Sequence, residues 1–206
     1  MTAVPAVRQF DAESVFRDEL LDGERVLWAG QPDARRLFSQ TDVFLVPFSL
    51  LWGGFAIYWE TSVLTSDHPD GPPLFFVLWG IPFVLVGLYL IFGRFLHKAR
   101  KKRRVYYAVT DRRVIALERA RRGDRVLAAF LDTIPTVNKR LRRDGSGSIT
   151  FGSSPWWTEW DSNTGMEMMG GGRGHWSGPV TFFDIQDAAT VAGLVNDLRR
   201  RQPARP

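Results

Sequence analysis

Two long runs without a charged residue constrain this chain more than any other feature. The first, VFLVPFSLLWGGFAIYW, covers residues 43–59 and reaches residue 64 if the mildly polar ETSVL is included. The second, LFFVLWGIPFVLVGLYLIFG, covers residues 74–93. At a rise of about 1.5 Å per residue, a helix of about 20 residues spans the ~30 Å hydrocarbon layer of a bilayer. Because neither run has the polar face of an amphipathic helix, we predict transmembrane helices at about 43–64 and 74–93.

The segment between the two runs, TSDHPDGPP, predicts a tight turn because its Asp-Gly and Pro-Pro steps break a helix. We therefore expect residues 37–97 to form an antiparallel transmembrane hairpin. This turn contains no Lys or Arg, whereas Arg35 and Arg36 precede the first run and RFLHKARKKRR follows the second. Basic residues flank membrane helices on the cytoplasmic side. The pattern predicts a multi-pass protein of the cell membrane (inner or plasma membrane) with both termini in the cytoplasm.

Three residues inside the hairpin carry weaker signals. Ser49 and Gly53 have the spacing of small residues that lets two helices approach closely. Glu60 is the one acidic residue within the two predicted helices, and we expect its carboxylate to face water at the membrane interface.

Alternating apolar residues on both sides of the hairpin predict β-strands. Before the hairpin, a short helix in DAESVFRDELL precedes a strand in GERVLWAG. After it, six strands are expected, at 104–110, 113–118, 125–131, 136–142, 149–152 and 179–185. The tail from Ile185 has apolar residues at spacings of three and four and ends in three Arg, which predicts an amphipathic helix.

This order of elements resembles the pleckstrin-homology (PH) superfold. The motifs GERVLWAGQP and YYAVTDRRVIAL resemble those of bacterial membrane-anchored PH-like domain proteins, in which a Tyr-x-Val-Thr-Asp-Arg-Arg-Val hairpin follows a transmembrane pair. The resemblance covers 23–118 by motif and 129–199 by pattern only. It implies an α+β membrane protein: a transmembrane helical hairpin inserted in a cytoplasmic PH-like seven-stranded β-barrel or sandwich, capped by a C-terminal α-helix. Residues 1–36 and 98–202 would then form the PH-like domain.

Inserting the hairpin between the first two strands would bring seven basic residues together at the cytoplasmic leaflet. They are Arg35, Arg36, Lys98, Arg100, Lys101, Lys102 and Arg103. Each Lys or Arg near anionic lipid contributes about 1 kcal/mol to binding, so these residues are candidate contacts to anionic headgroups. The role of positive charge in setting membrane topology explains the same run without any specific ligand.

The segment 153–178 departs from a minimal PH-like barrel. It is rich in Gly and contains Trp156, Trp157, Trp160 and Trp176. A flexible loop is one interpretation, and contact of the Trp side chains with the bilayer interface or a protein partner is the other. Its GGGRG stretch lacks the spacing of a phosphate-binding loop.

The composition excludes several kinds of chemistry. There is no Cys, which excludes disulfides, thiol catalysis and Cys-based zinc sites. The three His lie in different stretches, so we predict no metal and no cofactor. No nucleophile stands with a base and an orienting group, and we expect a protein that is not an enzyme.

PH-like domains, by resemblance, bind lipids, peptides or their own copies, so a membrane-anchored binding or scaffold protein is our first hypothesis. Anionic lipid, a protein partner or a homo-oligomer are its expected partners. The alternative is a small oligomeric transporter or channel-like membrane subunit built on the hairpin. The net charge of +5 also admits nucleic acid, but membrane tethering and the lack of a recognisable nucleic-acid-binding fold argue against it.

Overall fold

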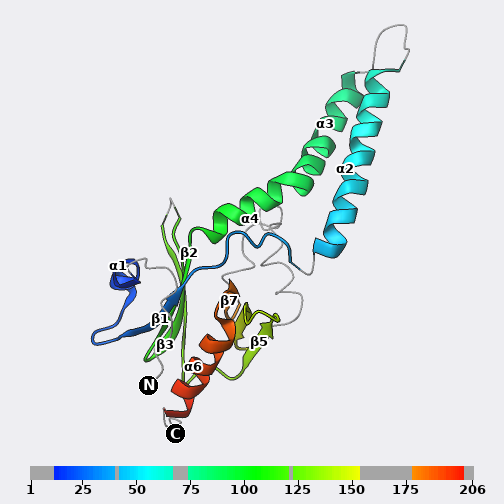
Figure 1. The fold of residues 1–206 in the computed structure, drawn as a ribbon. Helices are drawn as coiled ribbons and strands as arrows, with labels where there is room; N and C mark the ends of the chain where they lie inside the picture. The colour runs from blue at the N-terminus through cyan, green and yellow to red at the C-terminus, as the bar shows by residue number, and fades with distance from the viewer. Residues whose placement is uncertain (1–11, 40–41, 67–73, 121–122, 154–177, 202–206) are drawn as a thin grey trace.

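A two-helix stalk projects from a domain of two β-sheets in the computed structural model of the chain (Figure 1). The structure describes residues 12–39, 42–66, 74–120, 123–153 and 178–201. Within these residues the chain is α+β, with seven strands in two antiparallel sheets and a C-terminal helix. This part of the predicted fold class is confirmed.

The stalk consists of α2 (Asp42–Leu64) and a second helix that begins with α3 (Leu74–Leu88). This second helix continues through a π-helical turn (Tyr89–Gly93) into α4 (Arg94–Lys102). By length and composition, Asp42–Leu64 and Leu74–Lys102 are both able to cross a membrane. In the most apolar 18-residue stretch of each helix, only 22% of the first and 17% of the second is buried. The core helix of a soluble protein is mostly buried.

The second helix extends past the end of the apolar run at Gly93, where we expected the membrane helix to stop. The nine residues of α4 are RFLHKARKK, and Lys, Arg and Ala favour helix as strongly as Leu does. The end of an apolar run does not itself end a helix. At the π-helical turn the chain changes direction, so α4 leads away from the stalk towards the sheets (Figure 1).

The two stalk helices meet at small residues. A Cβ built on Gly87 would lie 2.8 Å from the Cα of Gly53, so the two backbones are in contact there. Ser49 is also buried on α2. Small residues allow such an approach in membrane helices, and the burial of Ser49 and Gly53 agrees with their predicted role.

The first sheet has the order β1-β2-β3-β4 and the second the order β5-β6-β7. Their bounds are β1 Val26–Gly30, β2 Val105–Thr110, β3 Arg113–Glu118, β4 Arg125–Phe130, β5 Val137–Leu141, β6 Gly147–Phe151 and β7 Val180–Ile185. Every predicted strand is present. The C-terminal helix α6 (Ala188–Arg201) is also present, and α1 (Ala12–Phe16) with a following 3-10 turn (Arg17–Glu19) forms the N-terminal helix.

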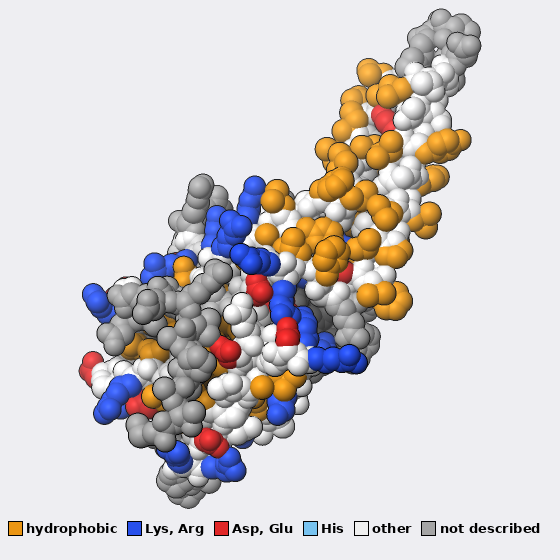
Figure 2. Space-filling model, viewed as in Figure 1, with side chains coloured by type: hydrophobic (Ala, Val, Ile, Leu, Met, Phe, Trp, Pro, Cys, Tyr) orange, Lys and Arg blue, Asp and Glu red, His pale blue; other side chains and the backbone are white. Residues whose placement is uncertain are grey.

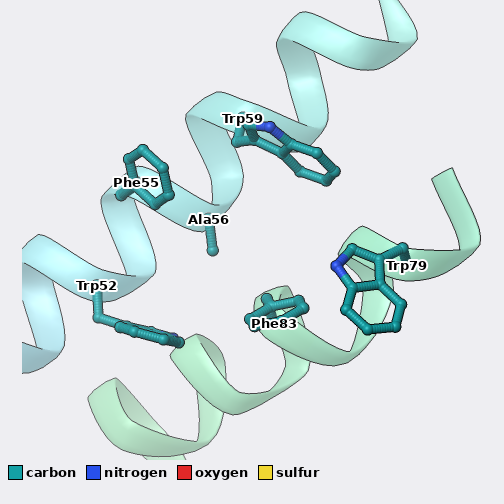
Figure 3. Close-up of a pocket in the computed structure, with 6 residues that line it drawn as sticks. All are labelled: Trp52, Phe55, Ala56, Trp59, Trp79 and Phe83. Atoms are coloured by element: carbon teal, nitrogen blue, oxygen red, sulfur yellow. The ribbon is translucent and has the colours of Figure 1, made fainter. Parts of the chain in front are cut away.

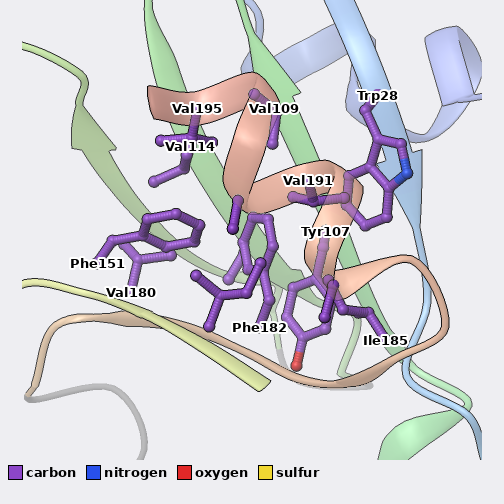
Figure 4. Packing of buried hydrophobic residues seen from close by; sticks show 14 of the residues in the cluster. Trp28, Tyr107, Val109, Val114, Phe151, Val180, Phe182, Ile185, Val191 and Val195 are labelled. Carbon is purple, nitrogen blue, oxygen red and sulfur yellow. The ribbon is translucent and has the colours of Figure 1, made fainter. Parts of the chain in front are cut away.

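The main core lies between the two sheets and α6 (Figure 4). Phe182 stands at its centre, with ring centroids 4.5 Å from Tyr107, 4.9 Å from Phe151 and 5.9 Å from Trp28. Aromatic pairs at these separations add to the stabilisation from burial. Because side chains alternate along a strand, Ala108 faces the opposite side of the first sheet and packs with Phe16 of α1.

The two motifs that carry the family resemblance contact each other. Glu24 of GERV is fully buried, and its carboxylate accepts hydrogen bonds from Thr110 Oγ1 at 2.6 Å and from Arg113 Nε and Nη2 at 3.0 Å. Asp111 accepts a hydrogen bond from the Arg25 amide at 3.1 Å. Thr110, Asp111 and Arg113 all belong to VTDRRV, so this motif joins β1 to the β2–β3 turn and has a structural role.

Candidate functional site

Five buried charged side chains gather where the stalk meets the sheets, and we call them the junction cluster. They are Asp42, Arg94, Lys98, Lys102 and Asp184. Asp42 begins α2, and Asp184 lies near the end of β7. The three basic residues follow one another at intervals of four along α4, which places them on a single helix face. One face of α4 therefore places three basic side chains in the interior of the protein.

Asp42 is the acidic centre of the upper half of the cluster. Its Oδ1 lies 3.0 Å from Arg94 Nη1, and its Oδ2 lies 3.7 Å from Lys98 Nζ. The Ser39 amide and hydroxyl donate to Oδ2 at 2.5 and 2.8 Å. A carboxylate at the first turn also suits the positive end of the helix dipole. Asp42 thus links the start of α2 to α4.

Asp184 is the acidic centre of the lower half. Lys102 Nζ donates to its Oδ2 at 2.6 Å, and Arg142 Nη2 donates to its Oδ1 at 2.7 Å. Burial opposes ionisation of this carboxyl, but Lys102 and Arg142 outweigh that cost and hold the pKa of Asp184 below its ordinary value. Lys102 Nζ also donates to the Arg36 carbonyl at 2.5 Å. Lys102 therefore ties α4 to β7 and to the segment between β1 and α2.

Several polar atoms of the upper half have no hydrogen-bond partner within the described residues. They are all three guanidinium nitrogens of Arg94, Nζ of Lys98 and Oδ1 of Asp42. The contacts of Asp42 with Arg94 and Lys98 are ion pairs without hydrogen-bond geometry. The Arg94 guanidinium also lies 4.5 Å above the Phe95 ring. Buried polar groups are normally hydrogen-bonded, so this half of the cluster has unused donors.

The seven basic residues predicted to contact headgroups divide into three groups by their burial. Lys98 and Lys102 are buried in the junction cluster, because the spacing of four along α4 turns both side chains into the protein. Arg36 is half-buried, with Nη2 2.7 Å from Asp144 Oδ2, and Lys101 is half-buried as well. Arg35, Arg100 and Arg103 are exposed. Figure 2 shows blue Lys and Arg side chains where the stalk meets the sheet domain.

Arg94 was not among the predicted site residues. It follows the apolar run directly, and it precedes Lys98 and Lys102 at the same helical spacing. This repeated spacing of four was the sequence signal that could have placed Arg94 on the same helix face as the two lysines. Trp156, Trp157, Trp160 and Trp176 lie outside the described residues.

The outer half of the stalk holds a cavity of about 180 Å³ between α2 and α3 (Figure 3). It is lined by Trp52, Phe55, Ala56, Trp59, Trp79 and Phe83. No lining side chain is ionisable, so the cavity suits apolar groups and offers no acid or base for catalysis. Near it, Glu60 differs from our expectation: its Oε2 is buried beside Gly80 and has no hydrogen-bond partner among the described residues.

Among the residues that the structure describes, no three His, Cys, Asp or Glu side chains come together in a way that could hold a metal ion. We compared the chain with protein-family models, with curated proteins and with solved structures, and none of the three comparisons gave a match.

Proposed function

We propose that this chain is a non-enzymatic integral membrane protein that presents a cytoplasmic PH-like binding domain. In this proposal α2 and α3 cross the bilayer, both termini lie in the cytoplasm, and the junction cluster lies at the cytoplasmic leaflet. The two sheets, the seven strands and the C-terminal helix support the PH-like assignment, because these are the elements that the resemblance implies.

The observation that carries the proposal is the apolar surface of the stalk. Large side chains on both helices are exposed; among them Phe44, Leu51, Tyr58, Leu74 and Phe75 are each at least 67% exposed. Figure 2 shows hydrophobic side chains, in orange, over much of the stalk. A soluble monomer rarely exposes an apolar surface of this extent. A bilayer would cover it.

The exposed arginines at the junction support contact with anionic lipid. Arg100 and Arg103 lie just beyond the apolar part of the second helix and face solvent. Basic residues immediately cytoplasmic of a membrane helix attract anionic headgroups. We assign this surface attraction to Arg35, Arg100 and Arg103, which are exposed, whereas Lys98 and Lys102 are buried. A protein partner of the sheet domain belongs to the same proposal.

Lipid enrichment around the full chain tests the proposal. The protein is reconstituted with mixed phosphatidylcholine and phosphatidylglycerol, extracted gently, and its bound lipids are measured. We expect phosphatidylglycerol to be enriched with the native chain and not with an Arg100→Glu/Arg103→Glu variant. The matched control, Arg200→Glu/Arg201→Glu, reverses two charges at the end of α6 that lies away from the stalk (Figure 1). Equal enrichment in both variants would refute the lipid contact.

A further inference from the structure

The junction cluster contains more positive than negative charge. The Asp184 carboxylate already forms ion pairs with Lys102 and Arg142, at 2.6 and 2.7 Å. That leaves Asp42 as the carboxylate for both Arg94 and Lys98. Within the described residues, these two buried cations thus share one negative charge. A buried charge without a counter-charge is costly, and one additional anion of charge −1 would balance the group.

The donors needed to hold such an anion are present and unused. The side chains of Arg94 and Lys98 are only 1% and 5% exposed. Their nitrogens have no hydrogen-bond partner among the described residues. A guanidinium presents parallel N–H groups that match the oxygens of a phosphate, and an ammonium adds a compact charge beside it. The residue types and their unused donors fit a phosphate group.

The depth of Arg94 in the bilayer identifies the class of phosphate. The apolar run that precedes it holds 20 residues, from 74 to 93. At about 1.5 Å per residue this run spans the ~30 Å hydrocarbon layer. Arg94 is the first residue beyond it and therefore lies at the level of the lipid headgroups. The phosphodiester of a phospholipid lies at this level and carries one negative charge.

We propose that Arg94 and Lys98 together bind the phosphate group of one membrane phospholipid, inside the junction between α2 and α4. This inference rests on the proposed function, because it requires the stalk to cross a bilayer. It differs from the surface attraction of Arg100 and Arg103, since it assigns one phosphate to one site with a defined charge balance. Inorganic phosphate offers the same chemistry, and the experiment separates the two sources.

The test uses the purified full chain, freed of lipid in a phosphate-free detergent. Dihexanoyl phosphatidylglycerol, dihexanoylglycerol and inorganic phosphate are titrated separately, with binding followed by calorimetry and stability by thermal unfolding. We expect saturable binding of the phospholipid and a higher unfolding temperature, and neither effect with dihexanoylglycerol, which lacks the phosphate. Tighter binding of inorganic phosphate than of the phospholipid would overturn the lipid as the ligand.

Two variants locate the binding. Lys98→Met leaves Arg94 and Asp42 as a pair with balanced charge. We therefore expect this variant to lose affinity for the phospholipid by a factor of about ten or more, and its unfolding temperature should no longer respond to the lipid. Arg201→Gln, at an exposed position at the end of α6, is the control and should behave as the native chain does. If Lys98→Met does not fold, Arg94→Lys keeps the charge but loses the guanidinium, and the same weakening is expected.

Unchanged binding in the Lys98 and Arg94 variants, or an equal loss in Arg201→Gln, would overturn the site. So would the absence of saturable binding in the native chain, which would leave only water to satisfy the buried donors. Such results concern the phosphate site and leave membrane insertion intact. Membrane insertion is tested separately by the accessibility of single introduced cysteines.

Discussion

Asp42 at the start of α2 and Arg94 at the start of α4 form a buried ion pair, with Oδ1 and Nη1 3.0 Å apart and side chains 3% and 1% exposed. The pair joins the two helices of the stalk at one level. From Arg94 the basic face of α4 continues through Lys98 to Lys102, which contacts Asp184 of the sheet domain. The stalk and the sheets are thus connected by charged groups as well as by the chain.

Replacing Asp42 tests this connection. Asp42→Asn would leave Arg94 and Lys98 without their carboxylate, and removing one partner of a buried ion pair typically costs about 3–5 kcal/mol. Asp33→Asn is the control, because Asp33 pairs with a partly exposed Arg36 at 3.4 Å and such pairs contribute about 1 kcal/mol or less. Thermal unfolding of the full chain in detergent measures both. Equal losses would contradict the importance of the junction cluster.

Arg113 should matter far more than its neighbour in the same motif. Arg113→Ala would leave the fully buried Glu24 carboxylate without its charged partner, and we expect a loss of about 3–5 kcal/mol in the free energy of unfolding. Arg112 is exposed, so Arg112→Ala should change it by about 0.5 kcal/mol or less. Denaturant unfolding distinguishes the two. Two similar values would show that VTDRRV acts through something other than this contact.

Acid should destabilise the sheet domain through Glu24 and Asp184. Burial opposes ionisation of both, but Arg113 and other donors to Glu24, and Lys102 and Arg142 beside Asp184, leave each pKa below its ordinary value of 4.5 or 3.8. The unfolded chain then binds more protons, so this stabilisation is complete above these values and is lost as the pH falls through the lower folded-state pKa. Unfolding temperatures measured from pH 7 to pH 3 should fall below about pH 4.

Removing one of the two carboxyls identifies its share of this pH dependence. Asp184→Asn is expected to be less stable than the native chain at pH 7 and to lose less of its remaining stability in acid. A pH profile parallel to that of the native chain would contradict the assignment to Asp184.

The contact between the stalk helices can be tested at neighbouring glycines. A Cβ on Gly87 would lie 2.8 Å from the Gly53 backbone, whereas a Cβ on Gly54 meets nothing within 4 Å. Overpacking of this kind costs about 1–3 kcal/mol, so Gly87→Ala should destabilise the chain. Gly54→Ala should be neutral or stabilising, because Ala favours helix over Gly. Thermal unfolding in detergent compares them, and the reverse order would refute the close approach.

The strands could be predicted from the sequence because their signal is local. In β2, Tyr107 and Val109 face the main core while Ala108 faces α1, and this alternation can be read without knowing which strands pair. The end of the second stalk helix could not be predicted in this way. Hydropathy changes at Arg94, but the helix continues to Lys102 because Lys and Arg are themselves good helix formers.

The ion pairs of the junction cluster could not be predicted from the sequence. The spacing of Arg94, Lys98 and Lys102 shows that they share a helix face, but whether that face meets lipid, water or protein depends on distant residues. Their carboxylate partners, Asp42 and Asp184, lie in other elements. Asp184 lies near the end of β7 and pairs with Lys102 and with Arg142. Long-range ion pairs of this kind have no periodic signal.

The topology of the stalk can be measured directly because the chain contains no Cys. Thr65→Cys places a single thiol at the outer end of the stalk, and Asn196→Cys places one on an exposed face of α6. In intact cells that express the full chain, a membrane-impermeant maleimide should label Thr65→Cys, and should label Asn196→Cys only after permeabilisation. Labelling of both positions in intact cells, or of neither until permeabilisation, would contradict a membrane-spanning hairpin with a cytoplasmic sheet domain.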